Sequence, residues 1–481
     1  MFLNLRGSGS LYRRVYRALK SEISAGRLRP RSRLPSTRAL ALDLGVSRNT
    51  VMLAYEQLIA EGYLLSRQRS ATLVAGDTPP RISSARADVS PNKHAGLSSY
   101  GRYLIKDPAM PPAGSYEPRP GVRYDFRYGR PMVDAFPREI WRRLLAARGR
   151  TDSFEAYGYA SPSGYEPLRK ALADYLHRAR GIACEADQIV IVNGTQQALD
   201  LAARLLVEPG EHVVIEEPHY HSARLSFEAV GARLIAIDVD AQGLDTTQLP
   251  PKGAKVACVT PCHQFPTGVI MPLARRLALL DWASRTGAWI IEDDYVSEFR
   301  YGGQPIEALQ ALDRTERVIY VGTFSKTLFP ALRLGYLVLP HVLVRPFAIA
   351  KWMADRYTPT LAQEALTDFI TDGHFERYLR RASARNATRR QALIESLQKY
   401  FGTRVEIAGE NAGVHLLAWI NDLKAREVGS VIARAAGVGV GIYPINLYYL
   451  RPPRRAGFLF GYASLTEAQI RAGIQRLSQV M

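Results

Sequence analysis

The 481-residue sequence has few cysteines, no long apolar run and fewer acidic than basic side chains. Its three cysteines form no disulfide framework, and Cys258 and Cys262 have no second pair that would complete a zinc site. We therefore expect buried or incidental thiols and no metal site. No run is long enough to span a bilayer, and Met1 to Ser10 lacks the apolar core of a signal peptide. These absences predict a cytoplasmic protein with no membrane segment.

Acidic residues are scarcest near the amino terminus. The formal net charge is +18, and residues 1–76 hold thirteen Lys or Arg against four Asp or Glu. This surplus of nine is half of the net charge in under a sixth of the chain. A basic head on a less basic body predicts a module that binds a polyanion. The chain is also too long for one ordinary core, so two or more units are expected.

The basic head has the pattern of three short helices. Apolar residues recur at helical spacing from Leu11 to Ile23. A second helix is predicted after Ser36, its candidate N-cap, and it ends at the turn residue Gly45. A third begins with Ser-Arg-Asn-Thr at 47–50. Two short helices joined at a glycine predict a helix-turn-helix whose polar side chains reach base edges and phosphates. The residues expected to contact DNA are Arg38, Ser47, Arg48, Asn49 and Thr50.

Two further stretches, 63–65 and 72–74, predict the strands of a wing, with Arg67 and Arg69 at its tip. Residues 10–76 resemble the winged helix of GntR-type bacterial regulators, including the strings LPSTR at 34–38 and EGY at 61–63. That family usually carries glycines in the wing turn, where this chain has Arg69 and Ala71. The resemblance implies binding to double-stranded DNA.

Residues 77–121 shift in composition to Pro, Ser, Ala, Gly and Arg. The prolines in this stretch exclude a long helix or a central strand, and we expect a semi-extended linker. A flexible coil of this length spans roughly 35–40 Å. The predicted organisation is a DNA-binding domain at 10–76, a linker at 77–121 and a large domain at 122–481.

In the large domain, short strands alternate with helices from Phe126 onward, which predicts an α/β fold with a mainly parallel sheet. Such sheets bind ligands at the carboxyl ends of their strands. Several predicted strands end in side chains that suit a ligand, although an ordinary turn or a core tyrosine explains each one taken singly. These are Gly194 and Thr195 before a helix expected to begin at Ala198, Tyr220, Asp293 and Asp294 with Tyr295, and Lys326.

Lys326 comes just after a predicted strand at 317–321. The hydroxyl residues Thr323 and Ser325 precede it, and Arg333 follows seven residues later. A lysine in this setting suits a Schiff-base site for an aldehyde that carries a phosphate, and a solvated loop lysine is the alternative. A carboxylate at 293 or 294 could hold a pyridine nitrogen protonated, and a nearby phenol could bond a ring hydroxyl.

Three strings carry a family resemblance: Thr260-Pro261 through Thr267-Gly268, IEDDY at 291–295, and GTFSKT at 322–327 through RLGY at 333–336. Residues 123–481 resemble the fold-type I, class I aminotransferases, which bind pyridoxal 5'-phosphate (PLP) and have a smaller C-terminal α+β subdomain. With the winged helix, the whole chain resembles MocR/GabR-type transcriptional regulators. The resemblance implies a regulator that senses PLP itself, or an amine or amino-acid effector, by aldimine exchange at Lys326.

The resemblance also implies a role for each site residue. Lys326 would form the internal aldimine. Asp293, in preference to Asp294, would pair with the ring nitrogen, while Tyr295 would meet the ring oxygen and Tyr220 would stack on the ring. The phosphate would be surrounded by Gly194, Thr195, Thr323, Ser325 and Arg333. Tyr159 would reach the phosphate of a partner subunit, which implies a homodimer whose two heads bind an operator with two half-sites.

The sequence departs from working aminotransferases in two places. Phe265 replaces the asparagine that contacts the ring oxygen, a change shared with the regulator family. The segment 457–463 contains no arginine where those enzymes bind the substrate carboxylate, and Arg224, Arg451, Arg454 and Arg455 are substitutes or surface residues. We therefore expect a sensor with little or no turnover. The alternatives are an active aminotransferase with an appended DNA-binding domain, and a constitutive DNA binder whose cofactor is structural.

Overall fold

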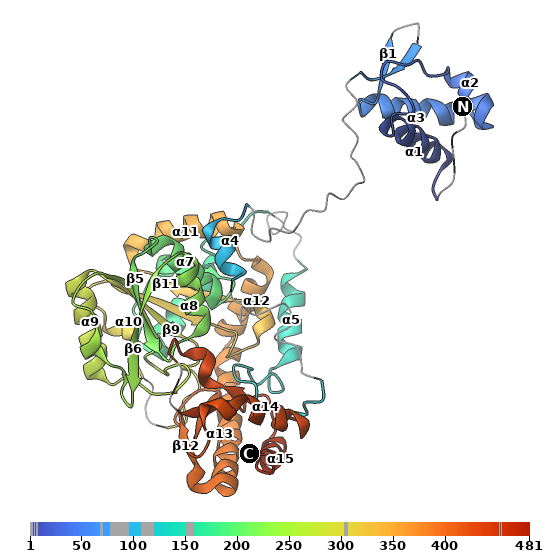
Figure 1. The fold of residues 1–481 in the computed structure, drawn as a ribbon. Coiled ribbons are helices and arrows are strands. Elements are labelled where there is room, and N and C mark those ends of the chain that lie inside the picture. Colours follow the sequence, from blue (N-terminus) through green and yellow to red (C-terminus); the bar gives the residue numbers. More distant parts are fainter. Residues whose placement is uncertain are drawn as a thin grey trace. The chain divides into compact units, whose positions relative to one another are not determined.

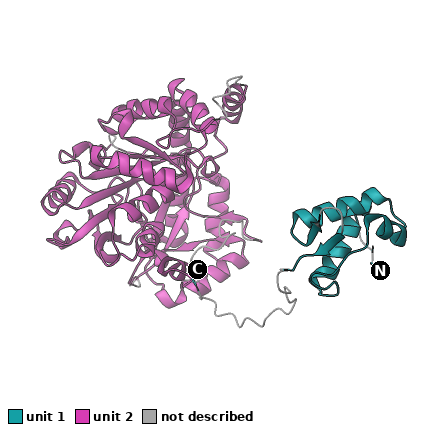
Figure 2. Cartoon of the chain, turned by 90° about the horizontal axis from the view of Figure 1, so that it is seen from above, with its two compact units in different colours: residues 1–96 teal, residues 97–481 magenta. Residues whose placement is uncertain are grey.

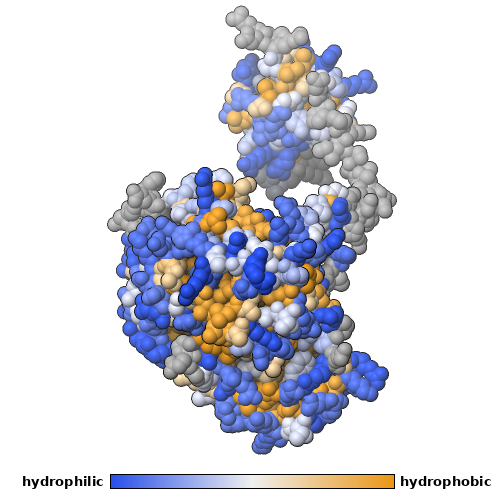
Figure 3. All heavy atoms as spheres, turned by 90° about the vertical axis from the view of Figure 1, so that its left-hand side faces the viewer, coloured by the Kyte–Doolittle hydropathy of each residue, from blue (hydrophilic) through white to orange (hydrophobic). Residues whose placement is uncertain are grey.

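The computed structural model describes residues 3, 5, 8–67, 71–76, 96–106, 120–150, 158–302, 306–451, 453 and 455–481 (Figure 1). The chain divides into two compact units, Met1–Gly96 and Leu97–Met481, which are coloured separately in Figure 2. The division lies inside the predicted linker. Both units expose a mixture of polar and apolar side chains (Figure 3).

Unit 1 has three helices and a two-stranded wing. Its elements are α1 (Leu11–Ser24), α2 (Thr37–Leu44), α3 (Arg48–Ala60), β1 (Leu64–Arg67) and β2 (Ala71–Val74). Helix α1 buries Val15, Leu19 and Ile23, which stand one helical turn apart, against the other helices. The backbone N–H of Ala39 donates to the Ser36 hydroxyl, so the predicted N-cap of α2 is confirmed.

The predicted linker contains one described helix, α4 (Ser99–Leu104), in a stretch that has no proline. The Tyr103 hydroxyl donates to Glu228 Oε2 at 2.8 Å, and Glu228 lies on α8 (His221–Ala229). Helix α4 therefore belongs to unit 2, where it packs on α8. Residues 77–95 and 107–119 lie outside the described part of the chain.

Unit 2 is built around an eight-stranded sheet in the order β4-β11-β10-β9-β8-β5-β6-β7. Its strands are parallel except β7 and β11, which confirms the predicted mainly parallel sheet. The bounds are β4 (Ile189–Val192), β5 (His212–Glu217), β6 (Arg233–Asp240), β7 (Gly243–Leu244), β8 (Ala254–Val259), β9 (Trp289–Asp294), β10 (Val318–Thr323) and β11 (Gly335–Val338).

Helices cover both faces of this sheet (Figure 1). The helices are α5 (Arg138–Arg148), α6 (Glu166–Arg180), α7 (Thr195–Leu206), α8, α9 (Leu273–Thr286), α10 (Leu309–Leu312), α11 (His341–Asp355) and α12 (Thr360–Thr371). Alternate residues of one strand pack on opposite sides: in β4, Val190 and Val192 join the core with α7 and α11, while Ile189 and Ile191 join the core with α6 and α12.

The carboxyl-terminal part forms a smaller α+β subdomain, as the resemblance implies. A four-stranded antiparallel sheet has the order β12-β13-β16-β15, and β3 pairs with β14. The bounds are β3 (Tyr124–Asp125), α13 (His374–Phe401), β12 (Val405–Ala408), β13 (His415–Ile420), α14 (Val428–Gly437), β14 (Val440–Gly441), β15 (Tyr443–Pro444), β16 (Ala456–Gly461) and α15 (Glu467–Leu477).

Candidate cofactor site and DNA-binding surface

The central strands β9 and β10 bring an acid and a lysine to the same edge of the sheet. The two strands are parallel, and Asp293 pairs in register with Val321 near the end of β10. Lys326 follows that end by three residues. Each side chain influences the pKa of the other: the positive charge of Lys326 lowers the pKa of Asp293, and the negative charge of Asp293 raises the pKa of Lys326. The structure therefore brings these two predicted site residues together.

Asp293 is buried in a setting that suits a positively charged ring nitrogen. Burial, with help from the neighbouring Asp294, raises the pKa of the Asp293 carboxyl to about 7. Among the described residues, nothing hydrogen-bonds to Asp293 Oδ1 or to the buried Tyr295 hydroxyl. Buried polar groups without partners are rare in proteins. A pyridinium with an adjacent ring oxygen offers the donor and the partner that these two groups lack, so the residues present fit PLP.

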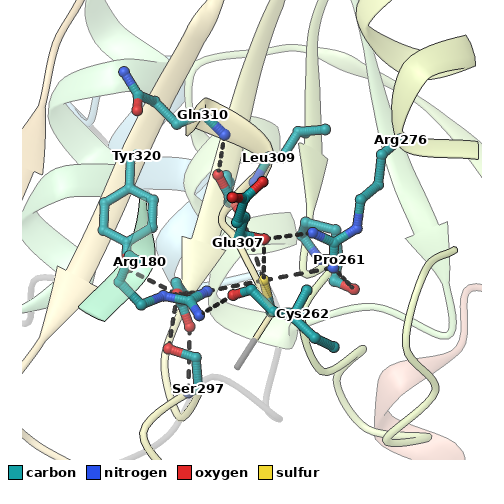
Figure 4. A network of polar contacts seen from close by, with 12 residues as sticks. Arg180, Pro261, Cys262, Arg276, Ser297, Glu307, Leu309, Gln310 and Tyr320 are labelled. Atoms are coloured by element: carbon teal, nitrogen blue, oxygen red, sulfur yellow. Dashed lines mark hydrogen bonds and ion pairs between the residues drawn. The ribbon is translucent and has the colours of Figure 1, made fainter. Parts of the chain in front are cut away.

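Asp294 has a different set of partners, of which Arg180, Ser297 and Tyr320 are labelled in Figure 4. Arg180 donates to Asp294 Oδ2 through Nε at 3.0 Å and Nη2 at 2.6 Å, and both side chains are buried. The hydroxyls of Tyr320 and Ser297 donate to the same oxygen, each at 2.8 Å. Asp294 is therefore engaged within the protein, while Asp293 faces Lys326.

Lys326 is held by a backbone carbonyl from a distant part of the chain. Its Nζ donates to the Gly129 oxygen at 2.8 Å. Burial lowers the pKa of Lys326, and the charge of Asp293 opposes this effect. A lysine with a lowered pKa has more of the neutral amine that attacks a carbonyl.

The residues predicted to bind the phosphate include Gly194 and Thr195, which lie where β4 meets α7. Gly194 has a left-handed φ of +83° and is the N-cap, so Thr195 is the first residue of the helix. We expected this helix to begin at Ala198, and its earlier start places Thr195 among the free backbone N–H groups that attract anions. Arg333 Nη2 donates to the Asn193 oxygen at 2.6 Å, and a Cβ on Gly194 would lie 3.2 Å from that nitrogen.

Thr323 and Ser325 lie at the end of β10, just before Lys326. The backbone N–H of Ser325 donates to Thr323 Oγ1 at 3.2 Å, and Thr323 is buried as the last residue of the strand. The two hydroxyl residues thus form one tight turn immediately before the lysine. Both side chains are neutral hydroxyls, which can donate hydrogen bonds to a phosphate.

Aromatic rings surround the position of Phe265. Its ring lies 5.6 Å from Tyr220 and 5.7 Å from Tyr295, edge to face in both cases. Phe265 is buried. The position that holds an asparagine in working aminotransferases is therefore filled here by an apolar ring, which packs between Tyr220 and Tyr295.

Tyr159 is not part of the site within one chain. Its side chain is 92% exposed, and its ring meets the edge of Tyr357 at 6.2 Å. The predicted substitute arginines are engaged elsewhere: Arg224 pairs with Glu228, Arg451 with Asp238 and Arg455 with Glu406. Arg454 lies outside the described residues.

Two residues near Asp293 and Lys326 could not be assigned to the site from the sequence. Glu216 is buried at the end of β5, and burial raises its pKa to about 7, although Thr260 Oγ1 donates to it at 2.7 Å. Its place at a strand end is the same signal that pointed to Asp293. Gly129 stands 197 residues before Lys326, and nothing local in the sequence indicates that contact.

In unit 1, most of the residues predicted to contact DNA lie at the start of α3. Ser47 Oγ accepts the Thr50 N–H at 3.1 Å and lies 2.8 Å from Thr50 Oγ1, so these two side chains form the N-cap. Arg38, Arg48 and Asn49 are exposed. The side chain of Arg67 and residue Arg69, which we expected at the wing tip, lie outside the described part of the chain.

Within the described residues, no helix combines the length and the apolar character needed to cross a membrane. The fold and the two sites define a winged helix-turn-helix joined to an aminotransferase-like domain with a PLP site.

Comparison with known proteins places this chain in a family. The model "Aminotransferase class I and II" matches residues 135–477, and "Bacterial regulatory proteins, gntR family" matches residues 11–74. The "Probable rhizopine catabolism regulatory protein MocR" of Rhizobium meliloti is 38% identical over 97% of this chain and 93% of its own. The "HTH-type transcriptional regulator TauR" of Rhodobacter capsulatus is 34% identical over 100% and 98%.

Among solved structures, the Pyrococcus horikoshii kynurenine aminotransferase, crystallised in complex with PMP, is 30% identical. It matches 75% of this chain and 90% of its own with a TM-score of 0.69. The chain belongs to the aminotransferase class I and II family, and with its gntR-family domain it is a MocR-type transcriptional regulator that uses PLP.

Proposed function

We propose that this regulator senses PLP, or an amine or amino-acid ligand that takes the place of Lys326 on the cofactor, and that the occupied site alters operator binding. The observation that carries the proposal is the buried Asp293 carboxyl beside Lys326, in a chain with its own DNA-binding domain. A ligand shifts a conformational equilibrium only if it binds one state better than the other. Exchange of a covalent partner at Lys326 supplies such a difference.

The site residues have distinct proposed tasks. When bound, PLP supplies a carbonyl that amines attack and a ring that accepts electrons. Asp293 holds the ring nitrogen protonated, and the Tyr295 hydroxyl bonds the ring oxygen. Tyr220 stacks on the ring. Five residues bind the phosphate: Gly194, Thr195, Thr323, Ser325 and Arg333.

Two observations favour sensing over turnover. Phe265 gives the ring oxygen no polar contact, because its side chain packs among aromatic rings. The buried strand β16 contains no arginine, and Arg451 and Arg455, which precede it, pair with carboxylates on the surface. An amine can still exchange with Lys326, whereas repeated turnover also needs a substrate clamp and a proton shuttle.

We also propose a homodimer that binds an operator with two half-sites. Tyr159 is largely exposed in one chain, which suits a side chain that reaches the phosphate of a partner subunit. Helix α11 offers a nearby apolar surface, with Val342, Ile349 and Met353 exposed. Large exposed apolar surfaces mark sites of protein association. A regulator that binds the chromosome acts in the cytoplasm, as the sequence predicts.

Turnover separates this proposal from an active aminotransferase. The PLP-loaded protein is incubated with amino donors and a 2-oxo acid acceptor, and new amino acid is measured over many equivalents of protein. We expect at most about one equivalent. Sustained product formation that disappears in Lys326→Ala, but not in the control Lys170→Ala at an exposed lysine paired with Glu166, would overturn the sensor proposal.

A further inference from the structure

The outward face of α3 carries two apolar side chains that unit 1 does not bury. Met52 is 37% exposed and Leu53 is 43% exposed, whereas the preceding residue, Val51, is fully buried. Both follow closely after the Ser47 N-cap, in the same helix as the residues predicted to contact DNA. An apolar side chain in this place suits an apolar feature of the DNA.

The opposite face of α3 fixes how the helix is turned. Val51, Ala54, Tyr55 and Leu58 are buried in the core of unit 1. The Tyr55 hydroxyl also donates to the Pro35 oxygen at 2.9 Å, close to the start of α2. Because packing and a hydrogen bond both hold this face, the exposed side chains of α3 keep one orientation relative to α2.

Met52 lies in one row with the two exposed polar residues of the first turn. It follows Arg48 by four residues and Asn49 by three, and both of these side chains are exposed. Residues three and four apart are neighbours on the surface of a helix. Leu53 has this relation to Asn49 alone. Met52 therefore continues the row of predicted DNA contacts along the helix.

The chemistry of Met52 selects one feature of the major groove. A thioether has no hydrogen to donate and is only a weak acceptor. The base edges in the major groove present donors, acceptors and one large apolar group, which is the 5-methyl group of thymine. A methionine side chain is flexible and polarizable, so it adapts its shape to such a group. Met52 thus matches thymine better than the other three bases.

We propose that Met52 is a specificity-determining residue that contacts the 5-methyl group of a thymine in the operator. Three or four residues of helix span roughly 4.5–6 Å, and base pairs are stacked roughly 3.4 Å apart. The thymine is therefore about one or two base pairs from the base that Arg48 or Asn49 contacts. This inference concerns how DNA is read and does not depend on the sensing function proposed above.

Removal of single methyl groups from the DNA tests the contact. The PLP-loaded full-length protein selects duplexes from a random library, and each thymine of the selected site is replaced in turn by deoxyuridine, which lacks only the 5-methyl group. Affinity is measured by fluorescence anisotropy at fixed salt. At one or more thymines we expect deoxyuridine to raise Kd about threefold to tenfold, the range for the loss of one buried methyl group.

Variants then assign this methyl effect to Met52. At the sensitive thymine, Met52→Ala should bind the thymine and deoxyuridine duplexes equally, because the side chain that contacts the methyl group is gone. Leu42→Ala, at an α2 side chain that is 80% exposed, should keep the full methyl effect. Thermal unfolding checks that both variants are folded, which we expect because both side chains are exposed.

The proposal is overturned if no thymine of the selected site is sensitive to the loss of its methyl group, or if Met52→Ala keeps the wild-type methyl effect. Arg48→Ala separates these results from a failure of DNA reading by α3. If Arg48→Ala weakens binding while Met52→Ala keeps the methyl effect, only the role of Met52 is contradicted. If the library yields no enriched sequence, base reading by α3 fails as a whole, and the proposal fails with it.

Discussion

Asp293 and Asp294 are adjacent in the sequence and have different neighbours in the structure. Successive residues of a strand point to opposite faces of the sheet. Asp294 therefore meets Arg180 and Tyr320, which satisfy its charge, while Asp293 faces Lys326. Two acids that look equivalent in the sequence therefore have different surroundings, because neighbouring side chains of a strand lie on opposite faces of the sheet.

The raised pKa of Asp293 predicts a pH effect on the cofactor-free protein. The pKa is about 7 in the folded chain against an ordinary 3.8. The folded state thus keeps a proton that the unfolded state has lost, and stability falls as the pH rises from about 4 to about 7. About three pKa units correspond to roughly 4 kcal/mol. Asp293→Asn removes this penalty. Without cofactor, the free energy of unfolding of the variant should therefore increase relative to that of wild type as the pH rises.

Urea unfolding of both cofactor-free proteins at pH 5 and pH 8 measures this difference. The other buried carboxyls with a raised pKa, Glu216, Glu292 and Glu298, are present in both proteins. With PLP added, wild type should be more stable to urea than Asp293→Asn at pH 8, because asparagine cannot hold the ring nitrogen protonated. A difference in unfolding free energy that does not depend on pH would refute the assignment of Asp293.

At the scale of single elements, the end of β9 is fixed by a buried ion pair. The side chains of Arg180 and Asp294 are 6% and 2% exposed. Arg180→Ala leaves a buried carboxylate without its cation, so the free energy of unfolding should fall by roughly 3–5 kcal/mol. The neighbouring Arg178 pairs with Glu376 at the surface, and Arg178→Ala should cost less than about 1 kcal/mol. Urea unfolding measures both variants. If Arg178→Ala and Arg180→Ala lose similar amounts of unfolding free energy, the buried network does not stabilise β9 as described.

Helix α3 is the element expected to read DNA. Ser47 and Thr50 close its N-terminal cap, which leaves the exposed side chain of Arg48 in the first turn to contact a base or a phosphate. Arg48→Ala should weaken operator binding by about tenfold to a hundredfold. Arg27→Ala, at an arginine that pairs with Glu22, is the control and should change affinity little. Operator affinity is measured by fluorescence anisotropy at fixed salt. If Arg48→Ala binds the operator as tightly as wild type does, α3 is not the recognition helix.

Most elements of the fold could be predicted because their signals are local. Ser36 caps α2 and Gly45 ends it, as the residue types indicate. The start of α7 was placed three residues late, because Thr195 is a weak helix former and its place follows from the preceding glycine. The contact between Gly129 and Lys326 could not be predicted at all, since it depends on how the chain folds back over 197 residues.

At the scale of the whole molecule, the proposed dimer depends on α11. Met353 is 74% exposed, and Val342 and Ile349 are exposed on the same helix at spacings of seven and four residues. Met353→Asp should give a monomer in light scattering, with weaker PLP binding because Tyr159 no longer reaches a partner's phosphate. Leu277→Asp changes an exposed leucine on α9 and should leave the dimer intact. A monomeric wild-type protein, or a Met353→Asp dimer, would contradict this interface.

The central claim joins the two units: ligand exchange at Lys326 changes how the protein binds its operator. The most direct measurement records cofactor absorbance and operator anisotropy in the same sample during titration with an amino acid. We predict that the spectrum and the operator affinity change with one Kd in wild type, that the spectrum then stays constant, and that Lys326→Ala responds in neither signal. A spectral change with no effect on operator affinity would contradict the claim.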